Sequence, residues 1–288
     1  MNFNLKIFTS KFSRRIFFVF FLCALIPVCG LAVIAYRHVN QQLDEQFNTR
    51  LKRSVKSYSL FLYERFLVLE TEMTLASTHL SKTTGNLSDS IEEDFLKRLQ
   101  NRFNAMVLFN KDGKSRVIFG RIGGIESFNE KERSHLKTGN SLVKIQYISG
   151  GQLDLIMILP LDSEKHGEGF LVAKINPAYL LALKHEFHLP RNTDLIVKDE
   201  SQKIFYSSFQ VDSQVPSNFS QKTVGRSSGY FEFEWEGESY LACYRWIFME
   251  PKFLMPGFNI TFVQSETDAF LQMVEFKKIF PQVILLSL

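Results

Sequence analysis

Cysteine is scarce in this chain, and the positions of the cysteines exclude a disulfide-bonded scaffold. Only three cysteines occur in 288 residues, and Cys23 and Cys29 lie inside an uncharged apolar run. Cys243 is therefore the single cysteine outside that run, and it has no partner for a disulfide within a folded domain. It lies in a strand-like segment, which favours a buried core thiol over a reactive one.

The sequence also lacks the motifs of common enzyme classes. It contains no Gly-x-Ser-x-Gly motif, no Gly-Lys-Ser/Thr phosphate-binding loop and no Gly-x-Gly-x-x-Gly fingerprint. His185 and His188 flank Glu186, but they are three positions apart, whereas a zinc-protease helix needs histidines at i and i+4. We therefore predict that the chain is not an enzyme and has no catalytic residues, no metal site and no cofactor.

Acidic residues are missing from the first 15 positions, which carry four cations. These are Lys6, Lys11, Arg14 and Arg15. They equal the formal net charge of the whole chain, +4, so residues 16–288 sum to zero. The basic pI of 8.8 is thus a property of one short tail. It does not indicate a nucleic-acid-binding surface, and no nucleic-acid partner is expected.

Charge is absent again from Ile16 to Tyr36, a run of 21 residues. A bilayer core needs about 20 apolar residues as helix, so this run is long enough to span a membrane. A cleaved signal peptide is the alternative, but it would have a shorter apolar core and a small-residue cleavage site. Because the basic flank marks the cytoplasmic side, we expect residues 1–15 in the cytoplasm and the folded part on the other side of the membrane.

A second uncharged run, Ile279–Leu288, follows Lys277 and Lys278. Its ten residues would reach only about half of a hydrocarbon core as helix. We expect the truncated start of a second transmembrane helix, with the lysines at the membrane surface. The alternative is a C-terminal helix that packs on a soluble domain.

The segment after the first apolar run has the period of a long helix. Neither Pro nor Gly interrupts Arg37–Lys82. Its apolar residues recur at a mean spacing of 3.7. They are Leu43, Phe47, Leu51, Val55, Tyr58, Leu62, Phe66, Leu69, Met73, Ala76 and Leu80. The spacing is not a strict heptad, so a stalk helix that pairs with a second copy below and packs on a sheet above is expected.

Beyond residue 100 the pattern changes to alternating strands with hairpin turns. About five strands precede a short helix that begins near Pro177, and about five follow it. We predict an α+β fold with two tandem antiparallel-sheet domains. The expected segments are a basic tail 1–15, a transmembrane helix 16–36, a stalk helix 37–82, a membrane-distal domain 83–190, a membrane-proximal domain 191–265, an exit helix 266–278 and a truncated membrane helix 279–288.

This order resembles the double Cache domain, a tandem PAS-like extracytoplasmic sensor of bacterial transmembrane receptors. "FSRRIFFVFFLCALIPVCGLAVIAYRHV" looks like the first membrane helix of such receptors, and "GFLVAKINPAYLLAL" like the passage that closes the distal domain. "YLACYRWIFMEPKFLMPGFNITFVQSETDAF" and "FKKIFPQVILLSL" are similar to the end of the proximal domain and the start of the exit helix. The resemblance covers nearly the whole chain.

In such receptors a HAMP linker and an output domain follow, often a GGDEF or EAL domain of cyclic di-GMP signalling or a histidine kinase. The sequence departs from amino-acid-binding members, which carry an Arg-x-Trp-Tyr type cluster in the distal domain. Here Trp235 and Trp246, the two tryptophans, both lie in the proximal half. Recognition of an amino acid by that motif is therefore not supported.

In a PAS-like fold a ligand pocket forms between the sheet and the loops above it, where polar groups orient a small molecule. The candidate ligand contacts are Arg116, Arg121, Tyr147 and Asp154. The competing interpretation is that each is an ordinary surface or structural residue.

We therefore expect a membrane-anchored, homodimeric sensor module at the bacterial inner membrane, with its folded part in the periplasm. It would detect a small-molecule ligand and signal to a cytoplasmic output. The alternative is a membrane-anchored binding or scaffold protein without signalling output.

Overall fold

The computed structural model describes residues 11–81, 93–110, 114–124, 126–147, 153–161, 169–182, 189–209, 223, 226–269 and 282. The chain forms two compact units, Met1–Arg50 with Ser265–Leu288, and Leu51–Gln264. Both sheets lie in the second unit, except for Ser265 at the end of the last strand. The predicted membrane run 279–288 lies outside the described residues apart from Gln282.

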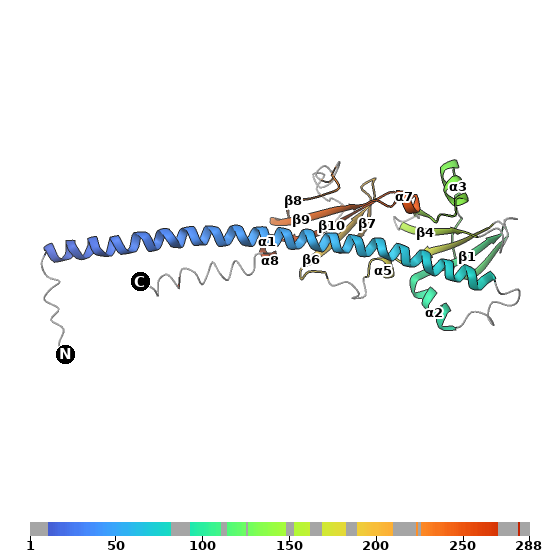
Figure 1. Ribbon diagram of the computed structural model, residues 1–288, viewed down its shortest axis with the longest axis horizontal. Coiled ribbons are helices and arrows are strands. Elements are labelled where there is room, and N and C mark those ends of the chain that lie inside the picture. The colour runs from blue at the N-terminus through green and yellow to red at the C-terminus, as the bar shows by residue number, and fades with distance from the viewer. Residues whose placement is uncertain are drawn as a thin grey trace. The chain divides into compact units, whose positions relative to one another are not determined.

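A single helix, α1, extends over 71 residues from Lys11 to Ser81 (Figure 1). The predicted membrane helix and the predicted stalk are parts of this one helix. By length and composition, one segment of the described chain, Arg14–Val39, could cross a membrane. Its large apolar side chains, such as Phe18 and Ile26, are exposed. An N-terminal apolar helix is thus confirmed, whereas its insertion in a membrane stays a prediction.

From Leu51 onward, α1 buries the apolar stripe that the sequence predicts. The exposed fraction is 2 % or less for Leu51, Val55, Tyr58, Leu62, Phe66, Leu69, Met73 and Ala76. These residues follow each other at intervals of three or four, so they share one face of the helix. Burial of this stripe against the sheets stabilises the helix far more than local propensity does.

The first sheet has five antiparallel strands in the order β2-β1-β5-β4-β3. The strands are β1 Phe103–Asn110, β2 Ser115–Phe119, β3 Leu142–Tyr147, β4 Leu153–Pro160 and β5 Gly169–Ile175. Three helices accompany them, α2 Glu93–Arg102, α3 Glu130–Lys137 and α5 Pro177–Leu180. Pro177 occupies the first turn of α5, as the sequence predicts, and Asn176 caps this helix.

The second sheet has the order β7-β6-β10-β9-β8. Its strands are β6 Thr193–Lys198, β7 Ile204–Ser207, β8 Ser228–Trp235, β9 Glu238–Ile247 and β10 Phe258–Ser265. The short helices α7 Glu250–Phe253 and α8 Glu266–Ala269 flank β10. When the strands of each sheet are numbered from one in chain order, both sheets have the order 2-1-5-4-3. The two sheets are therefore tandem copies of one topology. The predicted α+β fold with two antiparallel-sheet domains is confirmed.

Aromatic contacts pack α1 on one face of the second sheet. The ring of Tyr58 lies 5.5 Å from that of Phe262, and the ring of Phe66 lies 6.4 Å from that of Phe258. Because side chains alternate along a strand, Asn259, Thr261 and Val263 face the opposite side. Every residue of β10 is buried, so both faces of this central strand are covered.

Candidate functional site

The first sheet has one face that is covered by the chain between β2 and β3. Ile156 and Ile158 of β4 form a buried cluster there with Leu136, Leu142 and Val172. Leu136 belongs to α3, and Ile122 and Phe128 of the same connecting segment pack on the cluster. We call this the loop-side face. It has the features of a ligand site, which are an apolar floor and an irregular cover.

An ion pair lies within this apolar surface. Asp154 is two positions before Ile156 and therefore shares its face, and Lys174 is paired with Ile156 across β4 and β5. Lys174 Nζ lies 2.5 Å from Asp154 Oδ2, and the two side chains are 23 % and 12 % exposed. Removing either partner would leave a poorly solvated charge, so the two groups are held together.

A second ion pair fixes the cover to the sheet. Lys144 Nζ of β3 lies 3.1 Å from Glu132 Oε2 of α3 and 5.2 Å from the ring centre of Phe128. Glu132 also accepts a hydrogen bond from the backbone N–H of Asn129, whose side chain accepts one from the Glu132 N–H. This capping box anchors the start of α3 over the sheet. The loop-side face thus presents two ammonium and two carboxylate groups beside apolar side chains.

The structure brings only some of the predicted ligand contacts to this face. Asp154 lies on it, and Arg121 precedes Ile122 in the covering segment and is exposed. Tyr147 pairs with Leu153, and alternation places it on the opposite face from Asp154. Arg116 is an exposed residue of the edge strand β2, paired with Leu108, and alternation likewise turns it from the loop-side face.

Sequence reasoning missed Lys144, Lys174 and Glu132. Lys174 interrupts the otherwise apolar strand "GFLVAKI", and Lys144 lies between Val143 and Ile145 in "LVKIQY". A charged residue inside a strand that is buried on both faces needs a partner. That requirement is a signal by which Lys174 could have been matched to Asp154 in the neighbouring strand.

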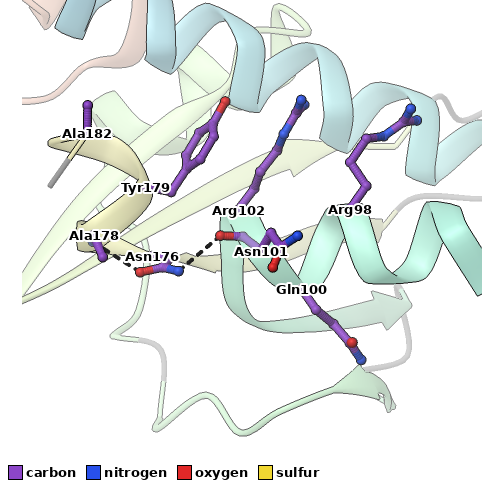
Figure 2. Close-up of a pocket in the computed structure, with 8 residues that line it drawn as sticks. All are labelled: Arg98, Gln100, Asn101, Arg102, Asn176, Ala178, Tyr179 and Ala182. Atoms are coloured by element: carbon purple, nitrogen blue, oxygen red, sulfur yellow. Dashed lines mark hydrogen bonds between the residues drawn. The ribbon is translucent and has the colours of Figure 1, made fainter. Parts of the chain in front are cut away.

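A groove of about 440 Å³ lies on another part of the first domain, between α2 and α5 (Figure 2). Arg98 and Arg102 of α2 and Tyr179 of α5 line it. Asn176 closes its floor, since its Nδ2 donates to the Asn101 carbonyl oxygen at 3.0 Å and its Oδ1 accepts from the Ala178 N–H at 3.0 Å. This side-chain bridge joins the end of α2 to the start of α5.

Groups suited to metal binding or nucleophilic catalysis are few in the described part of the chain. It contains no cluster of three His, Cys, Asp or Glu side chains that could hold a metal ion. Burial raises the pKa of the Cys243 thiol to about 11, so the thiolate is scarce at neutral pH. His185, Glu186 and His188 lie outside the described residues.

Comparison with known proteins finds solved domains of similar structure but no similar sequence. No model of a known protein family and no curated protein sequence matches the chain. The ligand-binding domain of the Campylobacter jejuni chemoreceptor Tlp3, solved with 4-methylisoleucine, is similar in structure with a TM-score of 0.53 and 14% sequence identity. The match covers 79% of this chain and 94% of that domain.

The ligand-binding domain of the Pseudomonas fluorescens chemoreceptor CtaA, solved with L-isoleucine, gives a TM-score of 0.51 at 14% identity. That match covers 82% of this chain and 98% of that domain. The sensory domain of Tlp3 with isoleucine bound matches with a TM-score of 0.51, also at 14% identity. The predicted resemblance is confirmed at the level of the fold: the chain has the double Cache, tandem PAS-like architecture of these sensory domains.

Proposed function

We propose that this chain is a membrane-anchored extracytoplasmic sensor module that binds a small molecule on the loop-side face of the first sheet. The observation that carries the proposal is the Asp154–Lys174 ion pair, which is largely buried in an apolar surface. A small ligand that carries one positive and one negative group could bind Asp154 with the first and Lys174 with the second. The apolar side chains would cover the rest of the ligand. The similar sensory domains, solved with isoleucine or a related amino acid, support such a ligand class.

Signal transmission would use α1. This helix is continuous from the apolar segment to the sheets, and its buried stripe contacts the domain interior. A ligand that binds one arrangement of the first domain more tightly would shift α1 relative to the chain that leaves β10 at Ser265. The output would be a cytoplasmic domain beyond a HAMP linker, with cyclic di-GMP turnover or kinase activity.

Anchoring would place the folded part in the periplasm. Arg14–Val39 is long and apolar enough to span, and the basic residues before it favour a cytoplasmic N-terminus. The exposure of Phe17, Phe20 and Leu31 on this helix fits a lipid environment better than water.

Dimerisation would use the exposed side of α1. Leu60, Val68 and Leu75 are 52%, 40% and 43% exposed, and their spacing of eight and seven places them on one side of the helix. A second copy of the same helix would cover this row in a two-fold arrangement, where each copy offers the same surface.

The proposal is tested by thermal unfolding of the full chain in lipid nanodiscs with a panel of amino acids and other small metabolites. A specific ligand raises the unfolding temperature by mass action. Asp154→Asn should abolish that rise, whereas Asp94→Asn, the same change at an exposed position of α2, should leave it intact. If no compound shifts the transition, the alternative of a membrane-anchored scaffold protein is favoured.

A further inference from the structure

The groove between α2 and α5 carries an excess of positive charge. None of its eight lining residues is acidic, and two of them are Arg98 and Arg102. The carboxylate beside these arginines is Glu72 of α1: its Oε2 lies 3.4 Å from Arg98 Nε, and its Oε1 contacts Arg102 Nη1. A third guanidinium, that of Arg65, lies 4.1 Å from the ring centre of Tyr179. The two guanidinium groups that contact Glu72 share one carboxylate, which leaves one positive charge in excess.

The Arg98 guanidinium is held loosely. Its side chain is half exposed, and Glu72 Oε2 accepts no hydrogen bond within the described residues. The contact between them is thus an ion pair without a formed hydrogen bond. A guanidinium has five N–H donors in a planar fork, far more than one shared carboxylate can occupy. Figure 2 shows the side chains of Arg98 and Arg102 projecting side by side from α2 toward α1.

Contacts between α1, α2 and α5 fix the walls of the groove. Tyr179 presents its ring to Arg65 on one side and lies 5.5 Å from the Arg102 guanidinium. Arg65 Nη1 also donates to the Tyr179 carbonyl oxygen at 3.1 Å, which ties α5 to α1. The bridge made by Asn176 fixes the floor. A groove with fixed walls binds a ligand at a smaller ordering cost than a mobile surface does.

We propose that this groove is a second ligand site, which binds a small anion through a carboxylate or phosphate group held between Arg98 and Arg102. Guanidinium groups match both oxyanions in geometry and bind them with charge-assisted hydrogen bonds. The groove volume of about 440 Å³ is within the range of small-molecule sites. The site uses none of the residues of the loop-side face, so it does not rest on the function proposed above.

A bound anion would compete with Glu72 of α1 for the guanidinium groups of Arg98 and Arg102. Glu72 belongs to α1 and holds the same two guanidinium groups, so the anion and Glu72 share one set of donors. Each weakens the binding of the other by the same factor, since coupling between two binding events is reciprocal. Anion binding therefore loosens the contact between α1 and α2.

The test is isothermal titration calorimetry of the full chain in phosphatidylcholine nanodiscs, with inorganic phosphate and malonate as probes. Ionic strength is held constant with chloride, which serves as the reference anion. At least one probe should show a saturable site. Arg98→Gln should weaken it by about tenfold or more, the loss of one charge-assisted contact. Lys97→Gln makes the same change of charge on α2 at an exposed position that is paired with Glu93. It should change the affinity by less than about twofold, because an exposed charge acts weakly.

Comparison of malonate with phosphate identifies the preferred oxyanion. Glu72→Gln removes the competing carboxylate at constant side-chain size, and it should increase the affinity for the probe. The absence of saturable binding by both probes would overturn the proposal, as would an equal loss in Arg98→Gln and Lys97→Gln. Weaker binding by Glu72→Gln would overturn the competition with α1. None of these outcomes bears on the small-molecule panel, which probes Asp154.

Discussion

The hydroxyl of Tyr58 donates a hydrogen bond to the carbonyl oxygen of Leu181, 3.0 Å away and 123 positions later in the sequence. Leu181 follows α5 at the end of the first domain. The ring of Tyr58 also contacts Phe262 in the second sheet, at 5.5 Å between ring centres. One side chain of α1 thus joins the end of the first domain to the core of the second.

Tyr58→Phe should destabilise the fold, because the buried Leu181 carbonyl loses its donor. The expected cost is about 1–2 kcal/mol in the free energy of unfolding at neutral pH. Urea denaturation followed by tryptophan fluorescence would measure it. A change near zero would show that the hydrogen bond contributes nothing net.

The same variant has a pH signature. Burial raises the pKa of Tyr58 well above its ordinary value of 10.0. The folded state therefore keeps the proton while the unfolded chain releases it above about pH 10. The stability advantage of the wild type over Tyr58→Phe should be full below pH 10 and shrink as pH rises beyond it. A difference that stays constant to pH 11.5 would contradict the assigned burial.

Lys198 in β6 gives a pH dependence of opposite sign. Its side chain is buried, and desolvation lowers its pKa from 10.5 to about 8. Between pH 8 and 10.5 the unfolded chain binds the proton more tightly than the folded one, so stability should rise with pH in this window. Lys198→Met should remove that rise and should be the more stable form at pH 7, by roughly 1–3 kcal/mol.

Comparison of the two unfolding curves at pH 7 and pH 10 measures the Lys198 effect. Lys203→Met, on the turn between β6 and β7, is the control for loss of a lysine at an exposed position. If wild type and Lys198→Met keep a constant difference across the window, the ammonium is not desolvated as described.

Glycines of the segment after β2 should differ sharply in their tolerance of alanine. Gly120 has a φ of +68°, and an added Cβ would lie 2.3 Å from the Asn104 carbonyl oxygen. Gly120→Ala combines a left-handed backbone with a backbone clash, so a cost of about 3 kcal/mol or more is expected. Gly123 has open space around it, and Gly123→Ala should change stability by less than about 0.5 kcal/mol.

Gly139 separates the cost of the left-handed backbone from the cost of the steric clash. Its φ is +82°, but nothing lies within 4 Å of an added Cβ. Gly139→Ala should therefore cost only the backbone term, about 1–2 kcal/mol. Thermal unfolding of the three variants gives the order, and an equal effect at positions 120 and 139 would show that the clash is relieved by local shifts.

Val68→Arg should weaken self-association if the exposed row of α1 is a dimer surface. Val68 lies between Leu60 and Leu75 on that row. Burying an unpaired guanidinium at such a surface is costly, so a loss of about tenfold or more in dimer affinity is expected. Sedimentation of the detergent-solubilised chain measures it. Val117→Arg, at an exposed valine of the edge strand β2, is the matched control and should leave the dimer unchanged.

Local patterns in the sequence predicted much of this fold. The buried stripe of α1 from Leu51 to Ala76 follows from spacing alone, and the start of α5 follows from Pro177. Three helices were missed, α2, α3 and α7. The α3 helix carries its own signal, the capping box from Asn129 to Glu132, but its eight polar-rich residues bury only Leu136. Such a short helix has too little apolar period to be recognised.

Long-range pairing could not be predicted from the sequence. The Asp154–Lys174 pair depends on β4 lying next to β5, and Glu72 meets Arg102 only because α1 packs beside α2. These neighbours are set by burial of whole faces, which no local window contains. Arg116 and Tyr147 lie on the other face of the sheet from Asp154, since one step along a strand turns a side chain to the other face. Their contact with a ligand stays a prediction.

In each sheet, the strand that comes first in the chain lies beside the strand that comes last: β1 beside β5, and β6 beside β10. The start of the one is paired with the end of the other. Phe103 at the start of β1 is paired with Ile175 at the end of β5, and Thr193 at the start of β6 is paired with Gln264 near the end of β10. The chain thus enters and leaves each sheet at the same place. Recombination could copy, delete or exchange one such cassette without breaking a strand pair of the other. One domain could therefore be exchanged for another of the same topology while α1 is kept.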